Sequence, residues 1–177
     1  MKIATFDPGK VASFAVYDTQ KPHLIEIGEI DVIGVGRLLR PCGQHIKEVL
    51  AGADVGLVEE VGAMKGQGVS SMFTFGMCFG AILNTIGSCG IQLETVTPAQ
   101  WKRSTRISAK SDEDVKTLAR AYATQLFPQH KDIFRVKKNH GMAEACLMAR
   151  WYFLKGPGCD VSDDEVKQVL EVEQNLV

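Results

Sequence analysis

Three acidic residues occupy positions from which their carboxylates could work together. Asp7 ends a short apolar run, Glu59 directly follows another, and Glu144 lies within the apolar segment 140–154. A carboxylate at a strand end faces a cleft while its backbone is held rigidly. Hard cations such as Mg²⁺ bind carboxylate oxygens and keep several waters, so two or three such residues suffice. With two ions such a site hydrolyses phosphodiesters, because one ion activates water and the other stabilises the leaving oxygen.

Two acids, Asp7 and Glu60, have plainer interpretations. Asp7 precedes Pro8 and Gly9, and Asp-Pro-Gly is a common turn sequence. Glu60 points to the opposite strand face from Glu59 and is interpreted as a solvated or structural acid.

The sequence has no Gly-x-x-x-x-Gly-Lys phosphate loop, no dinucleotide fingerprint, no nucleophile elbow and no His-Glu-x-x-His. We therefore expect no nucleotide cofactor.

The elements that position these acids alternate along the chain. Periodicity and turn signals predict three antiparallel strands and then strands joined by helices, with a bulge near Gly28 in the third strand. The predicted strands are 2–7, 12–17, 24–33, 55–58 and 91–96, and the predicted helices are 37–51, 70–86, 111–127 and 140–154. Because helix-connected strands pair in parallel, we expect an α/β fold with a mixed sheet.

Charge is unevenly distributed along the 177 residues, although the net charge is only −1. Between Trp101 and Lys138, ten Lys or Arg residues oppose four acids, a local balance of +6. Such a segment is typical of proteins that bind a polyanion, and an ordinary solvated face is the alternative. We assign one domain to residues 1–155 and an acidic tail or peripheral helix to 156–177, where the balance is −5.

The cysteines and the apolar segments indicate a cytoplasmic protein. The five cysteines are scattered and form no Cys-x-x-Cys pair, so neither a disulfide framework nor a zinc site is predicted. The first residues lack the apolar core and cleavage site of a secretory signal. The longest uncharged stretch, 66–93, contains several glycines and polar residues, so we interpret it as protein interior and expect no membrane span.

Several short motifs follow one another in a specific order. They are Asp7-Pro8-Gly9, Val58-Glu59, Gln67-Gly68-Val69-Ser70-Ser71 with Phe75-Gly76, Thr97-Pro98-Ala99-Gln100-Trp101-Lys102, and Ala143-Glu144-Ala145. Together they resemble the RuvC-like Holliday junction resolvases over residues 2–154, and the bacteriophage branch most closely. This resemblance implies a ribonuclease H-like fold with a five-stranded mixed sheet flanked by helices. It also implies a homodimer that cuts paired strands of branched DNA with one or two Mg²⁺ or Mn²⁺ ions per active site.

The resemblance assigns roles to individual residues. Asp7, Glu59 and Glu144 correspond to metal-binding catalytic acids. Lys102 and Lys110 correspond to lysines near the scissile phosphate, where a positive charge stabilises developing negative charge. A solvated lysine is the alternative for either position.

The chain departs from the family just before the last acid. The family has an acid or a histidine one turn earlier, where this chain has Gly141, which cannot bind a metal. His140 lies on the same helical face as Glu144 and could bind the metal or carry a proton. Asn139 differs from aspartate, which related phage sequences have here, only by its amide, so it is a candidate fourth metal site residue. A helix N-cap explains Asn139 equally well.

The sequence analysis thus favours a structure-selective DNA endonuclease that resolves Holliday junctions or other branched DNA. Helix 70–86, with Gly76, Gly80 and either Phe75 or Phe79, is the predicted dimer face. The predicted DNA-binding residues are Lys65, Gln67, Lys102, Arg103, Arg106, Lys110, Lys116, Arg120, Lys137 and Lys138. The alternatives are a branched-DNA binding protein that Asn139 has left without cleavage, and a ribonuclease H acting on RNA–DNA hybrids.

Overall fold

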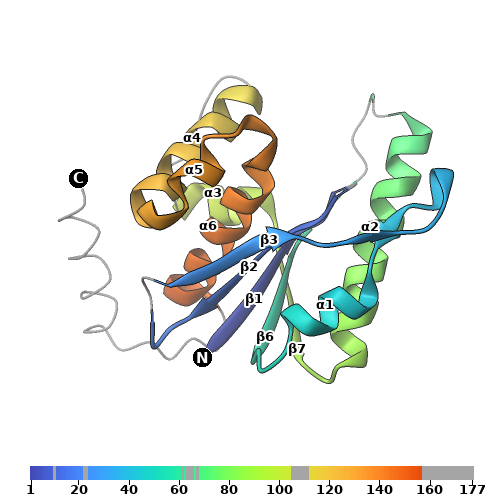
Figure 1. The fold of residues 1–177 in the computed structure, drawn as a ribbon, viewed down its shortest axis with the longest axis horizontal. Helices are drawn as coiled ribbons and strands as arrows, with labels where there is room; N and C mark the ends of the chain where they lie inside the picture. Colours follow the sequence, from blue (N-terminus) through green and yellow to red (C-terminus); the bar gives the residue numbers. More distant parts are fainter. Residues whose placement is uncertain are drawn as a thin grey trace.

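The structure, a computed structural model, describes residues 1–9, 11–21, 24–60, 62, 66, 68–104 and 112–156. Its main feature is a five-stranded sheet in the order β3-β2-β1-β6-β7 (Figure 1). The strands are β1 (Lys2–Asp7), β2 (Ser13–Asp18), β3 (Ile25–Glu29), β6 (Val55–Glu59) and β7 (Gln92–Val96). β1, β2 and β3 pair antiparallel, whereas β1, β6 and β7 pair in parallel. The predicted mixed five-stranded sheet is confirmed.

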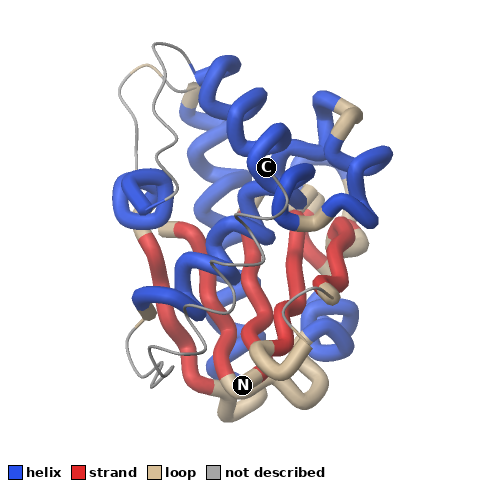
Figure 2. The backbone as a smooth tube through the Cα atoms, turned by 90° about the vertical axis from the view of Figure 1, so that its left-hand side faces the viewer, coloured by secondary structure: helices blue, strands red, loops and turns tan. Residues whose placement is uncertain are grey.

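Helices cover both faces of this sheet (Figures 1 and 2). On one face, α1 (Gly43–Val49) and α2 (Val69–Ser88) pack over a core that contains Ala4, Phe6 and Ile82. On the other face lie α3 (Pro98–Ser104), α4 (Asp112–Leu126), α5 (Lys131–Phe134) and α6 (His140–Lys155). Alternate side chains of β1 enter the two cores, because successive strand residues point to opposite faces.

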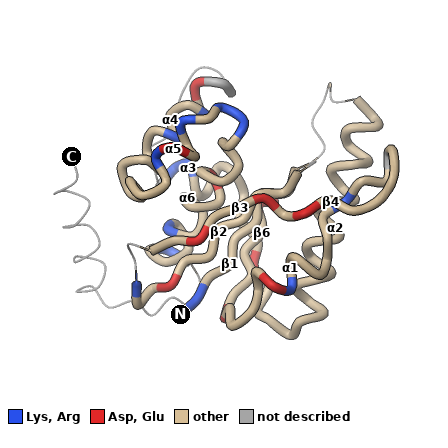
Figure 3. The backbone as a smooth tube through the Cα atoms, in the orientation of Figure 1, with Lys and Arg blue, Asp and Glu red and all other residues tan. Residues whose placement is uncertain are grey.

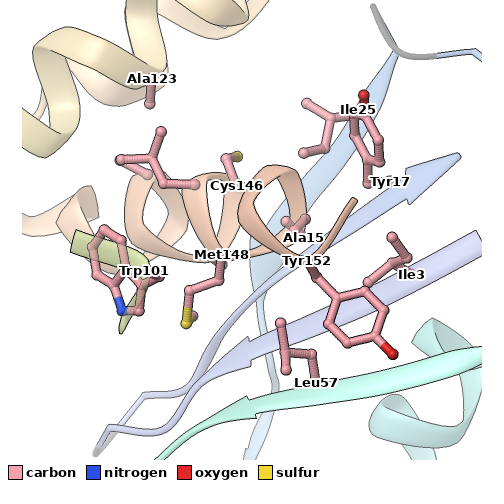
Figure 4. Packing of buried hydrophobic residues seen from close by; sticks show 14 of the residues in the cluster. Ile3, Ala15, Tyr17, Ile25, Leu57, Trp101, Ala123, Cys146, Met148 and Tyr152 are labelled. Carbon is pink, nitrogen blue, oxygen red and sulfur yellow. The ribbon is translucent and has the colours of Figure 1, made fainter. Parts of the chain in front are cut away.

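Helix α6 forms the centre of the second core and contacts β1, β2 and α4. Its residues from Gly141 to Arg150 are all buried, as its apolar sequence predicts. The Thr5 hydroxyl of β1 donates a hydrogen bond to the carbonyl of Ala145, with an oxygen–oxygen distance of 2.8 Å. Figure 4 shows Trp101 of α3 beside Met148 of this helix, within the same apolar cluster. α6 is therefore fixed to the strand that carries Asp7.

Two predicted elements are wrong in the region 24–51. The predicted strand 24–33 is divided: β3 ends at Glu29, and β4 (Val32–Ile33) pairs with β5 (Arg40–Pro41) in a separate two-stranded sheet. The predicted helix 37–51 begins only at Gly43, after a 3₁₀ turn over Gly36–Leu38. Pro41 lacks a backbone N–H and resists a helix interior, which accounts for the late start.

The predicted bulge at Gly28 is also wrong. β2 and β3 pair without interruption, and Gly28 lies opposite Phe14. A Cβ atom at residue 28 would lie 2.7 Å from the Phe14 ring. The glycine therefore makes room for an aromatic side chain, and it does not change the register.

Further short helices were not predicted from the sequence. They are α3, a 3₁₀ turn over Pro128–His130, α5, and η3 (Lys137–Asn139), which leads into α6. Each is seven residues or shorter, so the helical period is hardly visible in it. The first and last residues of the other three predicted helices differ by at most two positions from those of α2, α4 and α6.

Helix α2 has an unusually apolar surface. By length and composition alone it could span a membrane, yet only 22% of its most apolar window is buried inside the protein. Ile82 and Ile86 enter the core, whereas Phe73 is 65% exposed and Gly76 and Gly80 face open space. The interpretation of the stretch 66–93 as protein interior is therefore wrong for much of α2, and the predicted absence of a membrane span stays a prediction.

We predict that Gly56→Ala destabilises the protein by about 1–3 kcal/mol, because a Cβ atom at residue 56 would lie 2.7 Å from Ile86 Cγ2 of α2. Gly87→Ala is the matched control: nothing lies within 4 Å of its added Cβ, and alanine favours a helix, so stability should rise by up to about 1 kcal/mol. Chemical denaturation measures both. Equal stability of the Gly56 variant and the native protein would contradict the close packing of α2 on β6.

Candidate functional site

The sheet and α6 bring the three predicted acids together. Asp7 ends β1 and Glu59 ends β6, and these strands are parallel neighbours in which Phe6 lies opposite Val58. Their carboxyl ends therefore meet at one edge of the sheet. Glu144 reaches this edge from α6 and is only 7% exposed, while Asp7 and Glu59 are half-buried.

The electrostatics show how closely these carboxylates are coupled. Burial raises the pKa of Asp7 well above its usual value, and the negative charges of Glu144 and Glu59 raise it further. Burial also raises the pKa of Glu59, and the Glu144 charge adds to this rise. Since neighbouring negative charge disfavours the ionised forms of Asp7 and Glu59, a cation bound beside them would be stabilised.

Two lysines oppose this negative charge. Lys102 of α3 lowers the pKa of both Asp7 and Glu59, and its Nζ lies 4.0 Å from Glu144 Oε1. Lys116 of α4, predicted only as a DNA-binding residue, also lowers the pKa of Asp7. Its charge therefore acts on the edge of the sheet where the three acids meet.

The structure adds two residues to the site that were not predicted. The Trp101 indole N–H donates a hydrogen bond to Glu59 Oε1 at 2.8 Å. At Gly141, an added Cβ atom would lie 2.7 Å from both Asp7 Oδ2 and Ser13 Oγ, so this glycine lets α6 approach β1 closely. The glycine within an otherwise apolar helix was a usable signal, whereas Trp101 entered the sequence analysis only as part of the motif 97–102 and was given no role of its own.

Asn139 and His140 make local contacts at the start of α6. Asn139 occupies the N-cap position, but its side chain makes no capping bond and instead donates from Nδ2 to the Ile133 carbonyl at 2.9 Å. His140 Nδ1 lies 3.4 Å from the Lys137 carbonyl. Asn139 thus occupies the predicted N-cap position without the side-chain bond of a cap, and the metal-site roles of both residues remain predictions.

The three acids do not form a complete metal cage by themselves. Within the described residues, no three His, Cys, Asp or Glu side chains gather tightly enough to enclose a metal ion. Mg²⁺ seldom requires such a cage, because it keeps several waters and is usually bound by one or two carboxylates together with phosphate oxygens. The carboxylates of Asp7, Glu59 and Glu144, one buried and two half-buried, fit this mode.

The predicted DNA-binding residues that the structure describes lie on one helical layer or lead into it. Lys65, Gln67, Arg106 and Lys110 lie outside the described residues. Figure 3 shows basic residues along the layer of α3, α4 and α5, and Arg103, Lys137 and Lys138 are exposed there. This surface adjoins the carboxylates through Lys102 and Lys116.

Arg120 has an internal role that was not predicted. Its guanidinium donates to the carbonyls of Phe134 and Arg135 and to the Thr117 hydroxyl, at 3.2, 3.4 and 3.3 Å. It therefore joins α4 to the end of α5, and its DNA contact remains a prediction. Glu60 accepts a hydrogen bond from the Thr95 hydroxyl at 2.7 Å, in agreement with its interpretation as a structural acid.

Comparison with known proteins supports the resemblance. No protein-family model matches the chain. Two solved structures of Thermus thermophilus RuvC, one in complex with a Holliday junction substrate, superpose with TM-scores of 0.53 and 0.51. They are 20% and 16% identical, and the alignments cover 88% of this chain and 96% and 97% of theirs. The chain has the ribonuclease H-like fold of RuvC.

Part of the chain is also similar in sequence to a curated relative. The chain is 33% identical over 97 residues to the chloroplastic Holliday junction resolvase MOC1 of Chlamydomonas reinhardtii. The match covers 54% of this chain and spans only 10% of the length of that curated relative. The predicted RuvC-like resemblance is confirmed, whereas assignment to the bacteriophage branch stays a prediction.

We predict that Asp7→Asn stabilises the metal-free protein at neutral pH. Because the folded-state pKa of Asp7 is raised, its ionised carboxylate disfavours folding, and this cost is absent below the ordinary value of 3.8. The melting temperature should rise by about 2–4 °C, the shift that ~1 kcal/mol produces in a protein of this size. Thermal melts in EDTA at neutral and acidic pH measure it. A gain that persists in acid would contradict the electrostatic explanation.

Proposed function

We propose that this protein is a structure-selective DNA endonuclease that resolves Holliday junctions or other branched DNA by divalent-metal-dependent phosphodiester hydrolysis. The observation that carries the proposal is the convergence of Asp7, Glu59 and Glu144, opposed by Lys102, at one edge of a RuvC-like sheet. This arrangement combines oxygen ligands with a positive charge for a phosphate. The relatives named as Holliday junction resolvases support the choice of substrate.

In this proposal the acids and the lysine have different tasks. Asp7, Glu59 and Glu144 would hold one or two Mg²⁺ or Mn²⁺ ions. Bound there, such ions activate water and stabilise the leaving oxygen of the phosphodiester. Lys102 supplies positive charge beside Glu144, where the scissile phosphate would gain negative charge. Lys110 is proposed for the same task, and His140 or Asn139 completes the site.

The basic layer of α3, α4 and α5 is proposed to hold the DNA backbone. Contacts to phosphates supply affinity and orientation without reading sequence. Because this layer continues into Lys102 and Lys116, a bound strand would pass directly over the three acids. The overall charge of −1 does not oppose this mode, since the positive charge is concentrated near the site.

We propose that a second copy of the chain covers α2, which gives a homodimer. The support is the exposed apolar surface of this helix and an apolar groove of about 750 Å³ beside its first turns, lined by Leu38, Leu39 and Phe73. Phe75 is half-buried, and Phe79 packs partly against the core. A two-fold dimer presents two active sites to two opposed strands of a junction.

We also propose a cytoplasmic location, in the bacterial host if the protein is phage-encoded. The four cysteines within the described residues are free, and burial raises the pKa of the Cys78 and Cys146 thiols. Such thiols suit a reducing compartment.

A branched-DNA binding protein without cleavage is the second candidate. Asn139 favours it, because related phage sequences have an aspartate at this position. The bond from Asn139 to Ile133 shows that the amide group also has a structural use in this chain.

We predict that Asp7→Asn and Glu59→Gln each reduce metal-dependent cleavage at least ~100-fold and preserve junction affinity, because phosphate contacts dominate binding. Glu60→Gln is the matched control: it neutralises the neighbouring exposed acid and should leave cleavage unchanged. Single-turnover assays on four-way, forked, linear duplex and RNA–DNA hybrid substrates measure the rates.

The same assays test the dimer, because a dimer should cut the two opposed strands of a four-way junction symmetrically. Unchanged cleavage in either acid variant, or preferential cleavage of the hybrid, would contradict the proposal.

We predict that Asn139→Asp raises single-turnover cleavage at least ~10-fold, equivalent to about 1.4 kcal/mol of barrier, by adding a negative charge to the metal site. The same change replaces the amide donor that bonds Ile133, so stability should fall by about 1–3 kcal/mol. Rates must therefore be compared at a temperature where circular dichroism shows both proteins folded. Equal rates would leave His140 as the remaining candidate for the fourth site residue.

A further inference from the structure

Helix α3 presents two consecutive residues to two different acids of the site. Trp101 has no exposed surface, and its indole N–H donates to Glu59 Oε1 at 2.8 Å. The next residue, Lys102, places its Nζ 4.0 Å from Glu144 Oε1 and 5.1 Å from the centre of the Trp101 ring. Acids from β6 and α6 are thus both connected to one short helix.

The position of the indole N–H is fixed by packing. The Trp101 ring belongs to the core cluster that includes Met148 and other residues of α6 (Figure 4). A ring fixed in this way can direct its donor at only one place. A glutamate side chain, by contrast, has several rotatable bonds and loses conformational entropy when it is held in one orientation.

We propose that Trp101 is a positioning residue whose indole N–H holds the Glu59 carboxylate in the orientation in which it binds a divalent cation. The proposal rests on the proposed function, because it deepens the account of the same site. Groups that orient metal ligands through hydrogen bonds typically change metal affinity or activity 10–100-fold when removed. The alternative is a core tryptophan whose buried N–H has simply found a nearby acceptor.

The first experiment observes the indole directly, without DNA. A ¹⁵N-labelled protein gives indole N–H signals for its two tryptophans, Trp101 and Trp151, and Trp151→Phe assigns them. Addition of Mg²⁺ should move the Trp101 signal and leave the Trp151 signal in place. Asp7→Asn should abolish the movement, because it removes another acid of the site without touching the indole bond.

The second experiment removes the donor and keeps an aromatic ring. The backbone amide signal of Gly141 reports Mg²⁺ binding in this experiment. Trp101→Phe should raise the Mg²⁺ concentration for half-maximal binding at least ~10-fold. The Mg²⁺ concentration for half-maximal cleavage should rise equally, while junction affinity stays unchanged. Trp151→Phe is the matched control, because Trp151 is partly exposed on α6, and it should leave both values unchanged.

The outcomes separate this proposal from the proposed function. Unchanged Mg²⁺ dependence in folded Trp101→Phe would overturn the positioning role, even if the native protein cleaves junctions normally. If that variant does not fold, the native indole signal decides: no movement at Mg²⁺ concentrations that saturate the Gly141 signal overturns the role. If the native protein cleaves no branched DNA but its Trp101 signal moves with Mg²⁺, the proposed function fails and the positioning role stands.

Discussion

The gathering of three carboxylates at one partly buried edge of the sheet is the constraint on which the rest of the structure depends. Burial disfavours the ionised forms of Asp7 and Glu59, and the negative charge of Glu144 adds to the cost for both. Such a cluster persists only if the surrounding elements are rigid enough to prevent the side chains from moving apart. The parallel pairing of β1 with β6 provides this rigidity for two of the acids. The bond from Thr5 to Ala145 and the close approach at Gly141 provide it for the third.

Only one of the two helical layers contributes residues to the acidic cluster. α6 is buried along ten consecutive residues, so it cannot shift without disrupting the core, and it carries Glu144. α3 and α4 then bring Lys102 and Lys116 close enough to offset part of the negative charge. α2, on the opposite face, contributes no acid and leaves much of its apolar surface exposed. The helices that complete the candidate site and the helix proposed for association thus lie on opposite faces of one sheet.

The successes and errors of sequence interpretation have physical causes. Long elements such as α4, with its apolar stripe, and α6, which is apolar nearly all round, carry an extended signal, so their positions were predictable. The region 24–51 was misinterpreted because short strands and 3₁₀ turns carry little periodic signal. Gly28 was mistaken for a bulge, since a sequence cannot show that the Phe14 ring lies against it.

By itself, the sequence determined the mixed sheet, the strand-end positions of Asp7 and Glu59, and the presence of Glu144 in a buried helix. These follow from local patterns, namely apolar periodicity and the turns that end each run. Only the tertiary structure decided that Trp101 bonds Glu59, that Lys116 acts on Asp7, and that Arg120 joins α4 to α5. These contacts depend on how helices cross and on which side chains then meet. Residues distant along the chain make them, so no local pattern encodes them.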